Sequence, residues 1–458
     1  MSIKIEKSDI DIEHRLKEKL PRKIHFSGIG GAGMTPLAML LSEQGFSVSG
    51  TDLTESDNVR RLRARGIEID VPHSKRLLQG AELLVRSLAV PDNSPELEYS
   101  RAEGIPVWSR AELLGAVARL HGKTVAVAGS HGKSTTTAML DCIFTSLSLG
   151  QTTVSGAKLS DGETLRIGDG SLFLCEACEY RRAFLNIKPN VALITNIELD
   201  HTDTYGCEEE IYSAFLQFAE SAEHVVLGTD TPLSRRLSLE SHTRVVRFGD
   251  GEADFSLESF SQGGRGSSFR VRWAGGEDEI NLSVPGIANA KDALGAYALC
   301  MTLGLPAESV KWALSGFSGI DRRLELIGYI EGRAVYYDYA HHPTEIINTI
   351  STLKELHGRV SVLFRPHTYS RTSALFEDFV TSLGLADFVT LVEIYAAREE
   401  NLSGVTSEGL ARAIGSRAVC MDSERALSYM LSSTEGAIVL MGAGDIDGII
   451  REAMSLRE

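Results

Sequence analysis

The stretch VAVAGSHGKSTTTAML, residues 125 to 140, decides the fold. An apolar run enters a glycine-rich turn, and a helical pattern follows it. A buried strand, a tight turn and a helix in this order begin a parallel α/β unit whose ligand loop lies at the carboxyl end of the strand. Glycines let backbone amides approach phosphate oxygens, so the stretch predicts a phosphate-binding loop.

The side chains of this loop suit a nucleoside triphosphate. Lys133 supplies positive charge to the β and γ phosphates, and Ser134 offers a hydroxyl to Mg²⁺. Val127 stands where the strict motif has its first glycine, so the loop is a shortened variant. The alternative is a glycine-rich structural turn. The residues that we expect to contact the triphosphate are Gly129, Ser130, His131, Gly132, Lys133, Ser134 and Thr135.

A second glycine loop, GIGGAGM, occupies residues 28 to 34 between an apolar run and a helical pattern. Gly28, Gly30 and Gly33 have the spacing of a dinucleotide fingerprint, and Asp52 ends the next expected strand, where it can meet a ribose hydroxyl. Taken alone, this pattern predicts NAD. The same geometry holds any diphosphate joined to a ribose, including a UDP-sugar.

Composition limits the class of protein. The chain has 458 residues, 43% apolar residues and a net charge of −16. The negative charge argues against nucleic acid or an anionic membrane as partners. The sequence contains no run of about 18 apolar residues, so we expect no membrane span. The N-terminus is too charged for a signal peptide. Six scattered cysteines favour reduced thiols and a cytoplasmic protein. Cys175 and Cys178 suit a zinc site or two thiols at a strand end.

Alternating strand and helix patterns divide the chain into three expected α/β domains with parallel sheets. Residues 1–120 predict a Rossmann-like domain, residues 121–320 a central ATPase-type domain, and residues 321–458 a Rossmann-like C-terminal domain. Residues 243 to 284 interrupt the alternation with a β-rich pattern.

Carboxylates follow two strands of the central domain. Glu176 lies in the run SLFLCEA, and Glu198, Asp200, His201 and Asp203 lie in TNIELDHTDTY. Carboxylates and an imidazole near a triphosphate predict Mg²⁺ binding. Solvated loop charges are the alternative.

Two loops of the C-terminal domain carry further polar residues. YYDYAHHPTEI places His341 and His342 before Pro343, which suits the first turn of a helix. FRPHTYSRT gathers His367 and Arg371 in one loop, which suits an anionic partner or an exposed basic loop paired with local acids.

These stretches together resemble the Mur ligase family, the ATP-dependent amino-acid ligases of peptidoglycan precursor synthesis. The resemblance is carried by HFSGIGGAGM, AGSHGKSTTTAM, TNIELDHTDTY, GIDRRLEL, YDYAHHPTEI, RPHTYSRT and MGAGDI, which span nearly the whole chain in the family's order. It implies the joining of L-alanine to the carboxylate of UDP-N-acetylmuramate through an acyl phosphate, with ATP and Mg²⁺, by a monomer or weak homodimer.

The resemblance also implies a role for individual residues. The UDP-substrate site is Gly28, Gly30, Gly31, Gly33, Asp52 and Ser87. Besides the phosphate loop, Asn289, Arg322 and Asp338 bind ATP. Ser134, Glu176 and His201 bind metal, and Tyr339, His341 and Arg371 bind the amino acid. The residues expected to act in catalysis are Lys133, His201, His341 and Arg371.

Some positions depart from the family pattern. Ala288 and Asp292 stand where a His and an Asn are usual in the adenine-contacting stretch, and Asn289 is the residue that matches. Cys178 stands where an Asp is common. Three alternatives stay open: a related ligase that attaches recycled tripeptide to the same UDP-sugar, a non-catalytic nucleotide-binding paralogue, and an NAD-dependent oxidoreductase.

Overall fold

The computed structural model describes residues 18–159, 161–169, 171–239, 243–264, 266–397, 399–444 and 446–456. They group into two compact units. The first unit comprises the described residues of Met1–Ile197, Tyr212–Ser256 and Ala293–Leu314; the second comprises those of Glu198–Ile211, Leu257–Asp292 and Ser315–Glu458. Among the described residues, no helix has the length and apolar character needed to cross a bilayer.

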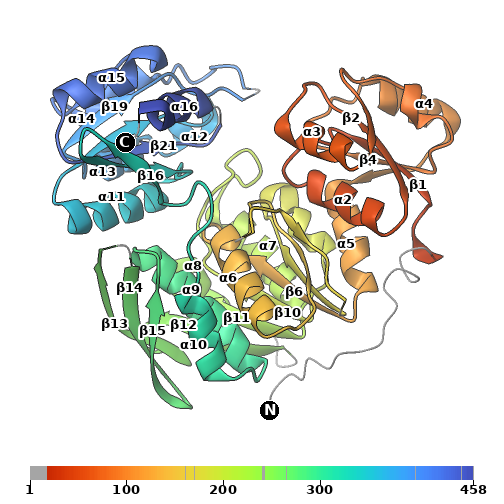
Figure 1. Cartoon of the computed structure of the whole chain (residues 1–458), viewed down its shortest axis with the longest axis horizontal. Coiled ribbons are helices and arrows are strands. Elements are labelled where there is room, and N and C mark those ends of the chain that lie inside the picture. The colour runs from red at the N-terminus through yellow and green to blue at the C-terminus, as the bar shows by residue number, and fades with distance from the viewer. Residues whose placement is uncertain are drawn as a thin grey trace. The chain divides into compact units, whose positions relative to one another are not determined.

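The first unit begins with a five-stranded parallel sheet in the order β3-β2-β1-β4-β5. This order matches the first five strands of the Rossmann order, as expected of a Rossmann-like domain. Three strands of the sheet, β1, β2 and β4, are labelled in Figure 1. Its strands are β1 (Lys23–Ser27), β2 (Ser47–Thr51), β3 (Glu68–Asp70), β4 (Leu83–Arg86) and β5 (Val107–Ser109). Its helices are α2 (Thr35–Glu43), α3 (Asp57–Ala64), η1 (Arg76–Leu78), α4 (Pro95–Glu103) and α5 (Arg110–Leu120).

Local sequence explains where these helices begin. Ser56 and Ser94 each accept a backbone hydrogen bond as N-cap residues of α3 and α4. Ser109 and Glu112 form a reciprocal capping box at α5. Such side chains satisfy amides that a helix leaves without a partner at its first turn.

The phosphate-loop stretch lies in the middle of a second sheet, ordered β12-β11-β10-β6-β9-β7-β8 within the first unit. Strand β6 pairs in parallel with β10 and β9, which places the loops after all three strands at one edge. The elements are β6 (Lys123–Ala128), α6 (Lys133–Ser146), β7 (Thr152–Val154), β8 (Leu165–Arg166), β9 (Leu172–Glu176), η2 (Tyr180–Asn186), β10 (Val191–Ile194), α7 (Glu208–Glu220), β11 (His224–Gly228), α8 (Pro232–Arg236) and β12 (Arg244–Asp250).

A β-rich segment and a third sheet follow along the chain. The segment contains β13 (Phe255–Gly263), β14 (Gly266–Trp273) and β15 (Gly276–Leu282), and it agrees with the β-rich pattern of residues 243 to 284. Helices α9 (Ile287–Thr302) and α10 (Ala307–Ser315) come next.

The third sheet has the order β16-β17-β21-β18-β19-β20, parallel except for β16. Its elements are β16 (Glu325–Ile330), β17 (Arg333–Asp338), α11 (Pro343–His357), β18 (Val360–Phe364), α12 (Tyr369–Ala374), α13 (Phe376–Leu383), β19 (Phe388–Leu391), α14 (Ser407–Ile414), β20 (Ala418–Cys420), α15 (Ser423–Ser433), β21 (Ala437–Met441) and α16 (Asp447–Leu456). Alternate residues of β18 enter two different cores: Val362 packs into one and Leu363 into the other. The sheet is therefore covered on both faces, as parallel sheets usually are.

The predicted fold class is confirmed, since all three predicted parts of the chain form α/β structure rich in parallel strands. The predicted helix start at Pro343 is also confirmed, with His342 as its N-cap.

Candidate functional site

The phosphate loop joins β6 to α6, and hydrogen bonds to the loop backbone and to Glu179 hold the Lys133 ammonium. Lys133 Nζ donates to the carbonyl oxygens of Gly129 at 2.5 Å and Ser130 at 3.1 Å, and to Glu179 Oε1 at 3.0 Å. The Glu179 side chain is fully buried. A buried carboxylate and two carbonyls therefore fix the cation within the loop.

The backbone of this loop requires glycine at its first position. Gly129 has φ +141°, and a Cβ atom there would lie 1.9 Å from Thr195 Oγ1. Thr195 and Asn196, just after β10, hold the loop from the opposite side. Asn196 accepts a hydrogen bond from the His131 amide at 2.9 Å, and the Thr195 hydroxyl donates to the His131 carbonyl at 2.5 Å.

The predicted metal ligands Ser134 and Glu176 are brought together. Ser134 Oγ donates to Glu176 Oε2 at 3.1 Å, while Glu176 Oε1 accepts from Ser155 Oγ at 2.7 Å and from the Gly156 amide at 2.9 Å. A carboxylate and a hydroxyl are hard oxygen donors, so this pair fits Mg²⁺. The third predicted ligand, His201, belongs to the second unit.

The other glycine loop follows β1, and the predicted residues Gly28, Gly30, Asp52 and Ser87 meet there. Gly28 has φ +78°, and a Cβ atom on it would lie 2.9 Å from the Cβ of Ser87. Asp52 Oδ2 accepts from the Gly30 amide at 2.8 Å, and Asp52 Oδ1 accepts from the Leu53 amide at 2.8 Å. The carboxylate expected to meet a ribose thus also fastens the loop itself.

A buried carboxylate lies beneath this loop. Glu96 Oε1 accepts hydrogen bonds from His73 Nδ1 at 2.5 Å, from Ser27 Oγ at 3.2 Å and from the hydroxyl of Thr51. The Thr51 carbonyl in turn accepts from the amides of Gly28 at 2.9 Å and of the next residue at 3.0 Å. Glu96 therefore connects the ends of β1 and β2 to the glycine loop.

The ionisation of this pair is shifted by its surroundings. Burial opposes ionisation of Glu96, but the hydrogen bonds from His73 and Thr51 outweigh it and lower its pKa to about 2. The hydrogen bond to Glu96 raises the pKa of His73. The neighbouring His25 is fully buried, and burial lowers its pKa to about 4.

In the second unit, Arg371 is paired with Asp200. Arg371 Nη2 donates to Asp200 Oδ1 at 2.7 Å and Nε donates to the same oxygen at 3.2 Å, with both side chains almost completely buried. The amide of His201 also donates to Asp200 Oδ1, at 2.6 Å. Asp200 thus joins two residues predicted to act in catalysis. Arg371 Nη1 lies 3.2 Å from His367 Nδ1.

His341 lies in the same cluster. Its Nδ1 is 2.9 Å from the Tyr339 carbonyl oxygen, and its ring centroid is 6.1 Å from that of His367. Because a carbonyl only accepts, Nδ1 carries the proton and Nε2 keeps a lone pair. Burial lowers the pKa of His341 to about 3, the charge of Arg371 lowers it further, and Glu345 opposes both. The predicted amino-acid residues Tyr339, His341 and Arg371 are therefore brought together.

Three predicted ATP-binding residues also belong to the second unit. The Arg322 carbonyl accepts from the Tyr339 amide at 2.7 Å, which places Arg322 beside the end of β17, where Asp338 lies. Burial raises the pKa of Asp338 to about 6, although a hydrogen bond from Thr349 opposes the rise. Asn289 lies in the first turn of α9 and donates to the Pro285 carbonyl at 2.7 Å.

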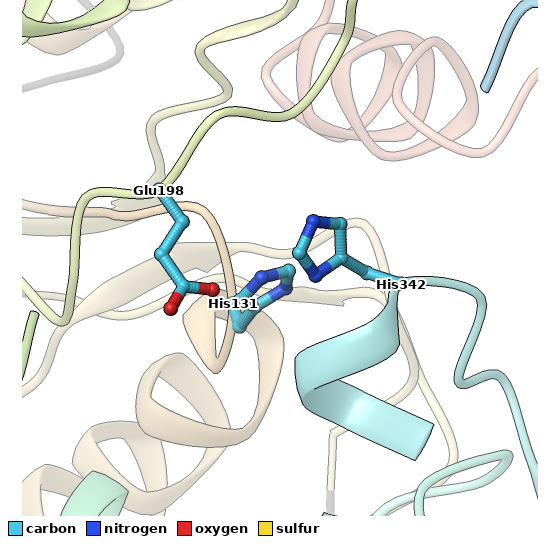
Figure 2. Close-up of side chains that lie close together, drawn as sticks. All are labelled: His131, Glu198 and His342. Carbon is cyan, nitrogen blue, oxygen red and sulfur yellow. The ribbon is translucent and has the colours of Figure 1, made fainter. Parts of the chain in front are cut away.

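Figure 2 shows the side chains of His131, which belongs to the first unit, and of Glu198 and His342, which belong to the second. His131 comes from the loop between β6 and α6, Glu198 from the segment after β10, and His342 from the residue before α11 (Figure 2). Within the second unit, Glu198 Oε2 accepts from Thr344 Oγ1 at 2.8 Å, and the Thr344 amide donates to His342 Nδ1 at 3.3 Å.

Sequence reasoning missed several residues of these loops. Glu179 was visible in CEACEY, three residues after Glu176, but a carboxylate facing the loop lysine has no sequence signature. Asn196 and Glu96 were equally hidden, since their hydrogen-bond partners lie far away in the chain. All six cysteines are free thiols, as expected for reduced cysteines.

Family models match nearly the whole chain in three consecutive parts. Residues 23–121 match the Mur ligase family catalytic domain, residues 127–300 the Mur ligase middle domain, and residues 322–444 the Mur ligase glutamate ligase domain.

Several relatives and solved structures resemble the chain over almost its full length. The UDP-N-acetylmuramate–L-alanine ligase of Agathobacter rectalis is 36% identical over 93% of this chain and 96% of its own. The enzyme of that name from Aquifex aeolicus is 37% identical over 94% and 96%. The crystal structure of the UDP-N-acetylmuramate-alanine ligase of Thermotoga maritima superposes with a TM-score of 0.79 at 29% identity, covering 94% of this chain and 99% of that one.

Proposed function

This chain belongs to the Mur ligase family, and on that premise we propose that it joins L-alanine to the carboxylate of UDP-N-acetylmuramate at the expense of ATP. The observation that carries the proposal is the presence of two glycine loops in one chain, each after a parallel strand and each held by a side-chain hydrogen bond to its backbone. Two such loops suit two phosphorylated substrates.

A free carboxylate is a poor acyl donor. Transfer of the γ-phosphoryl group of ATP to that carboxylate forms an acyl phosphate and ADP, and attack by the uncharged amine then releases phosphate. In this scheme Lys133 neutralises charge that develops on the transferred group, an effect that is strong in a site shielded from water. When bound between Ser134 and Glu176, Mg²⁺ would supply further positive charge to the phosphates.

The cluster around Asp200 suits the amino acid. Arg371 is a planar donor for the α-carboxylate of L-alanine. His341 has a free lone pair on Nε2, and its low pKa keeps it uncharged near neutral pH. We infer that His341 orients the amino group by accepting a hydrogen bond, since a group with so low a pKa is a weak base.

We also propose that each of the three parts of the chain binds a different substrate. Residues 1–120 would hold the UDP-sugar, residues 121–320 ATP, and residues 321–458 the amino acid. The proposal also includes two sets of contacts. His201 would bind the metal ion, and ATP would be contacted by Asn289, Arg322 and Asp338.

A phosphate-release assay tests the activity. With UDP-N-acetylmuramate, Mg²⁺ and ATP held constant, we expect release with L-alanine and weaker release with glycine or L-serine. Release with the tripeptide L-alanyl-γ-D-glutamyl-meso-diaminopimelate instead of L-alanine would move the chain to the recycling reaction. ATP binding without release in any arm would leave a nucleotide-binding protein.

Metal dependence has its own test. Chelation of Mg²⁺ should abolish phosphate release, and its return should restore it. Glu176→Gln should raise the Mg²⁺ concentration needed for half-maximal rate, whereas Glu163→Gln, which removes a half-buried carboxylate paired with Arg61 rather than with Ser134, serves as control. Equal Mg²⁺ requirements in both variants would remove Glu176 from the metal site.

A further inference from the structure

Arg110 lies across one glycine of the β1 loop. A Cβ atom built on Gly33 would be 2.9 Å from Arg110 Cδ, 3.1 Å from Nε and 3.2 Å from Nη1. The arginine side chain therefore occupies the space that any larger residue at position 33 would need. In a dinucleotide fingerprint the third glycine ordinarily permits close packing of helix against strand. Here it also admits a guanidinium to the loop.

The guanidinium is not neutralised locally. Among the residues that the structure describes, Arg110 has neither a hydrogen-bond partner nor an ion-pair partner. Arg110 is the first residue of α5, and the nearby Glu112 is engaged elsewhere, since its Oε2 accepts from the Ser109 amide at 2.6 Å. The side chain is half-buried. A half-buried cation without a counter-charge is costly unless an anion joins it.

The backbone of the adjacent loop includes amides that are available to donate hydrogen bonds to a ligand. The Gly30 amide donates to Asp52 and the Gly31 amide donates to the Gly28 carbonyl. The amides of Ala32 and Gly33 have no hydrogen-bond partner in the described part of the chain. A planar guanidinium and free amides on the same short loop are complementary to phosphate oxygens, which accept several hydrogen bonds at once.

The charge of Arg110 also reaches the segment after β9. Burial raises the pKa of Cys178, Glu179 raises it further, and the positive charges of Lys133 and Arg110 oppose the rise. The charges of Lys133 in the phosphate loop and of Arg110 beside the other glycine loop therefore both act on this thiol.

We propose that Arg110 is a substrate-binding residue whose guanidinium pairs with the diphosphate of the UDP-sugar over Gly33. The identity of the sugar rests on the proposed function, whereas the diphosphate contact does not. Gly33 has a complementary role, because its lack of a side chain leaves the space that the Arg110 side chain occupies.

Calorimetric titration of the full chain with UDP and with uridine tests this contact. Arg110→Met keeps the length of the side chain and removes its charge. We expect UDP affinity to fall by roughly tenfold to a hundredfold, the range for a lost charge-assisted hydrogen bond, with uridine affinity unchanged. Arg119→Met is the matched control, because Arg119 is on the same helix and donates to the Asn186 carbonyl. It should bind UDP as the wild type does.

Gly33→Ala supplies an independent arm. Its methyl group would displace the arginine, so it should weaken UDP binding in the wild type and have much less effect in the Arg110→Met background. Such non-additivity is the signature of two residues that act on one contact. Equal effects of Gly33→Ala in both backgrounds, or unchanged UDP affinity in Arg110→Met, would overturn the proposal.

Two further measurements keep the outcomes distinct. Arg110→Lys retains the charge but not the paired donors, so it should bind UDP with intermediate affinity and a wild-type salt dependence, while Arg110→Met should show a shallower one. Should the chain fail to release phosphate with L-alanine, the UDP titrations still decide the role of Arg110. A failure of both tests would remove the UDP-sugar altogether.

Discussion

Lys133 Nζ and Glu179 Oε1 lie 3.0 Å apart, and the glutamate side chain has no exposed surface. A buried charge needs its partner, because removal of one member of such a pair leaves the other uncompensated. The loop lysine is therefore both a phosphate ligand in the proposed reaction and a structural counter-charge. Any experiment on it must separate these two roles.

Lys133→Ala should lower the rate of ADP formation by roughly a hundredfold to a thousandfold, because the transferred phosphoryl group loses its fixed cation. It should also destabilise the fold by about 3–5 kcal/mol, since Glu179 is left buried and charged. Rates and urea unfolding midpoints measure the two effects.

The control is the double variant Lys133→Ala/Glu179→Gln, which removes the unpaired charge. Its unfolding free energy should recover while its rate stays low. Recovery of the rate together with stability would show that the lysine has no part in the chemistry.

Arg371→Lys should raise the KM for L-alanine by about tenfold or more, because lysine cannot offer the paired donors of arginine. The KM for ATP should change little. Lys354→Arg, on the exposed side of α11, is a control for charge at the surface. Steady-state kinetics with each substrate varied measures both constants; a rise confined to the ATP constant would contradict the assignment.

His201→Asn should slow the chemical step more than it weakens ATP binding. His201 has φ +50°, a left-handed conformation that asparagine tolerates better than alanine. We expect kcat to fall by roughly a hundredfold with the dissociation constant of ATP within about threefold of wild type. Single-turnover rates and ATP titration separate the two; weakened ATP binding at an unchanged rate would place His201 at the nucleotide instead.

Stability should depend on pH through His73 and Glu96. The folded pKa of His73 is raised, so its contribution is complete below about 6.5 and is lost as the pH rises through the folded value. The folded pKa of Glu96 is lowered to about 2, so its contribution is complete above about 4.5 and is lost as the pH falls toward 2. The stabilisation from the pair is therefore greatest between about pH 4.5 and 6.5.

Urea unfolding of wild type and His73→Gln across pH 3 to 9 measures this contribution. The difference between them should be about 1–3 kcal/mol inside that window and should shrink on both sides. Burial lowers the pKa of His25 in both proteins, and the charge of His73 lowers it further only in the wild type, so His25 also contributes to the difference at acid pH. A difference that does not vary with pH would mean that the pair is not ionised.

Local patterns sufficed for much of the fold. The apolar run before Gly129 predicted β6, and the histidine pair before Pro343 predicted the start of α11, because strand burial and helix starts depend on neighbouring residues. The β-rich interruption at residues 243 to 284 was visible from its glycine turns. The short strands β16 and β20 were missed, since three to six residues at a sheet edge have little apolar pattern of their own.

The site was predictable only in part. The pairing of Ser134 with Glu176 followed from the family resemblance, and it agrees with the parallel pairing of β6 and β9, which brings the two residues to one sheet edge. The counter-charges Glu179 and Asp200 could not be predicted, since which carboxylate faces which cation depends on loop geometry. Arg110 was missed for the same reason: its significance comes from the empty space at Gly33.

Both carboxylate oxygens of Asp52 accept hydrogen bonds from nearby backbone amides, one from Gly30 and one from Leu53. In dinucleotide-binding folds the acid at this position binds the ribose, so it is the natural residue to exchange when ligand preference is to be changed. In this protein, replacing Asp52 would remove the hydrogen bonds that hold the turn, and the loop would be disturbed whatever ligand was intended. Redesign of this protein toward other sugar nucleotides should therefore begin elsewhere on the loop and leave this aspartate untouched.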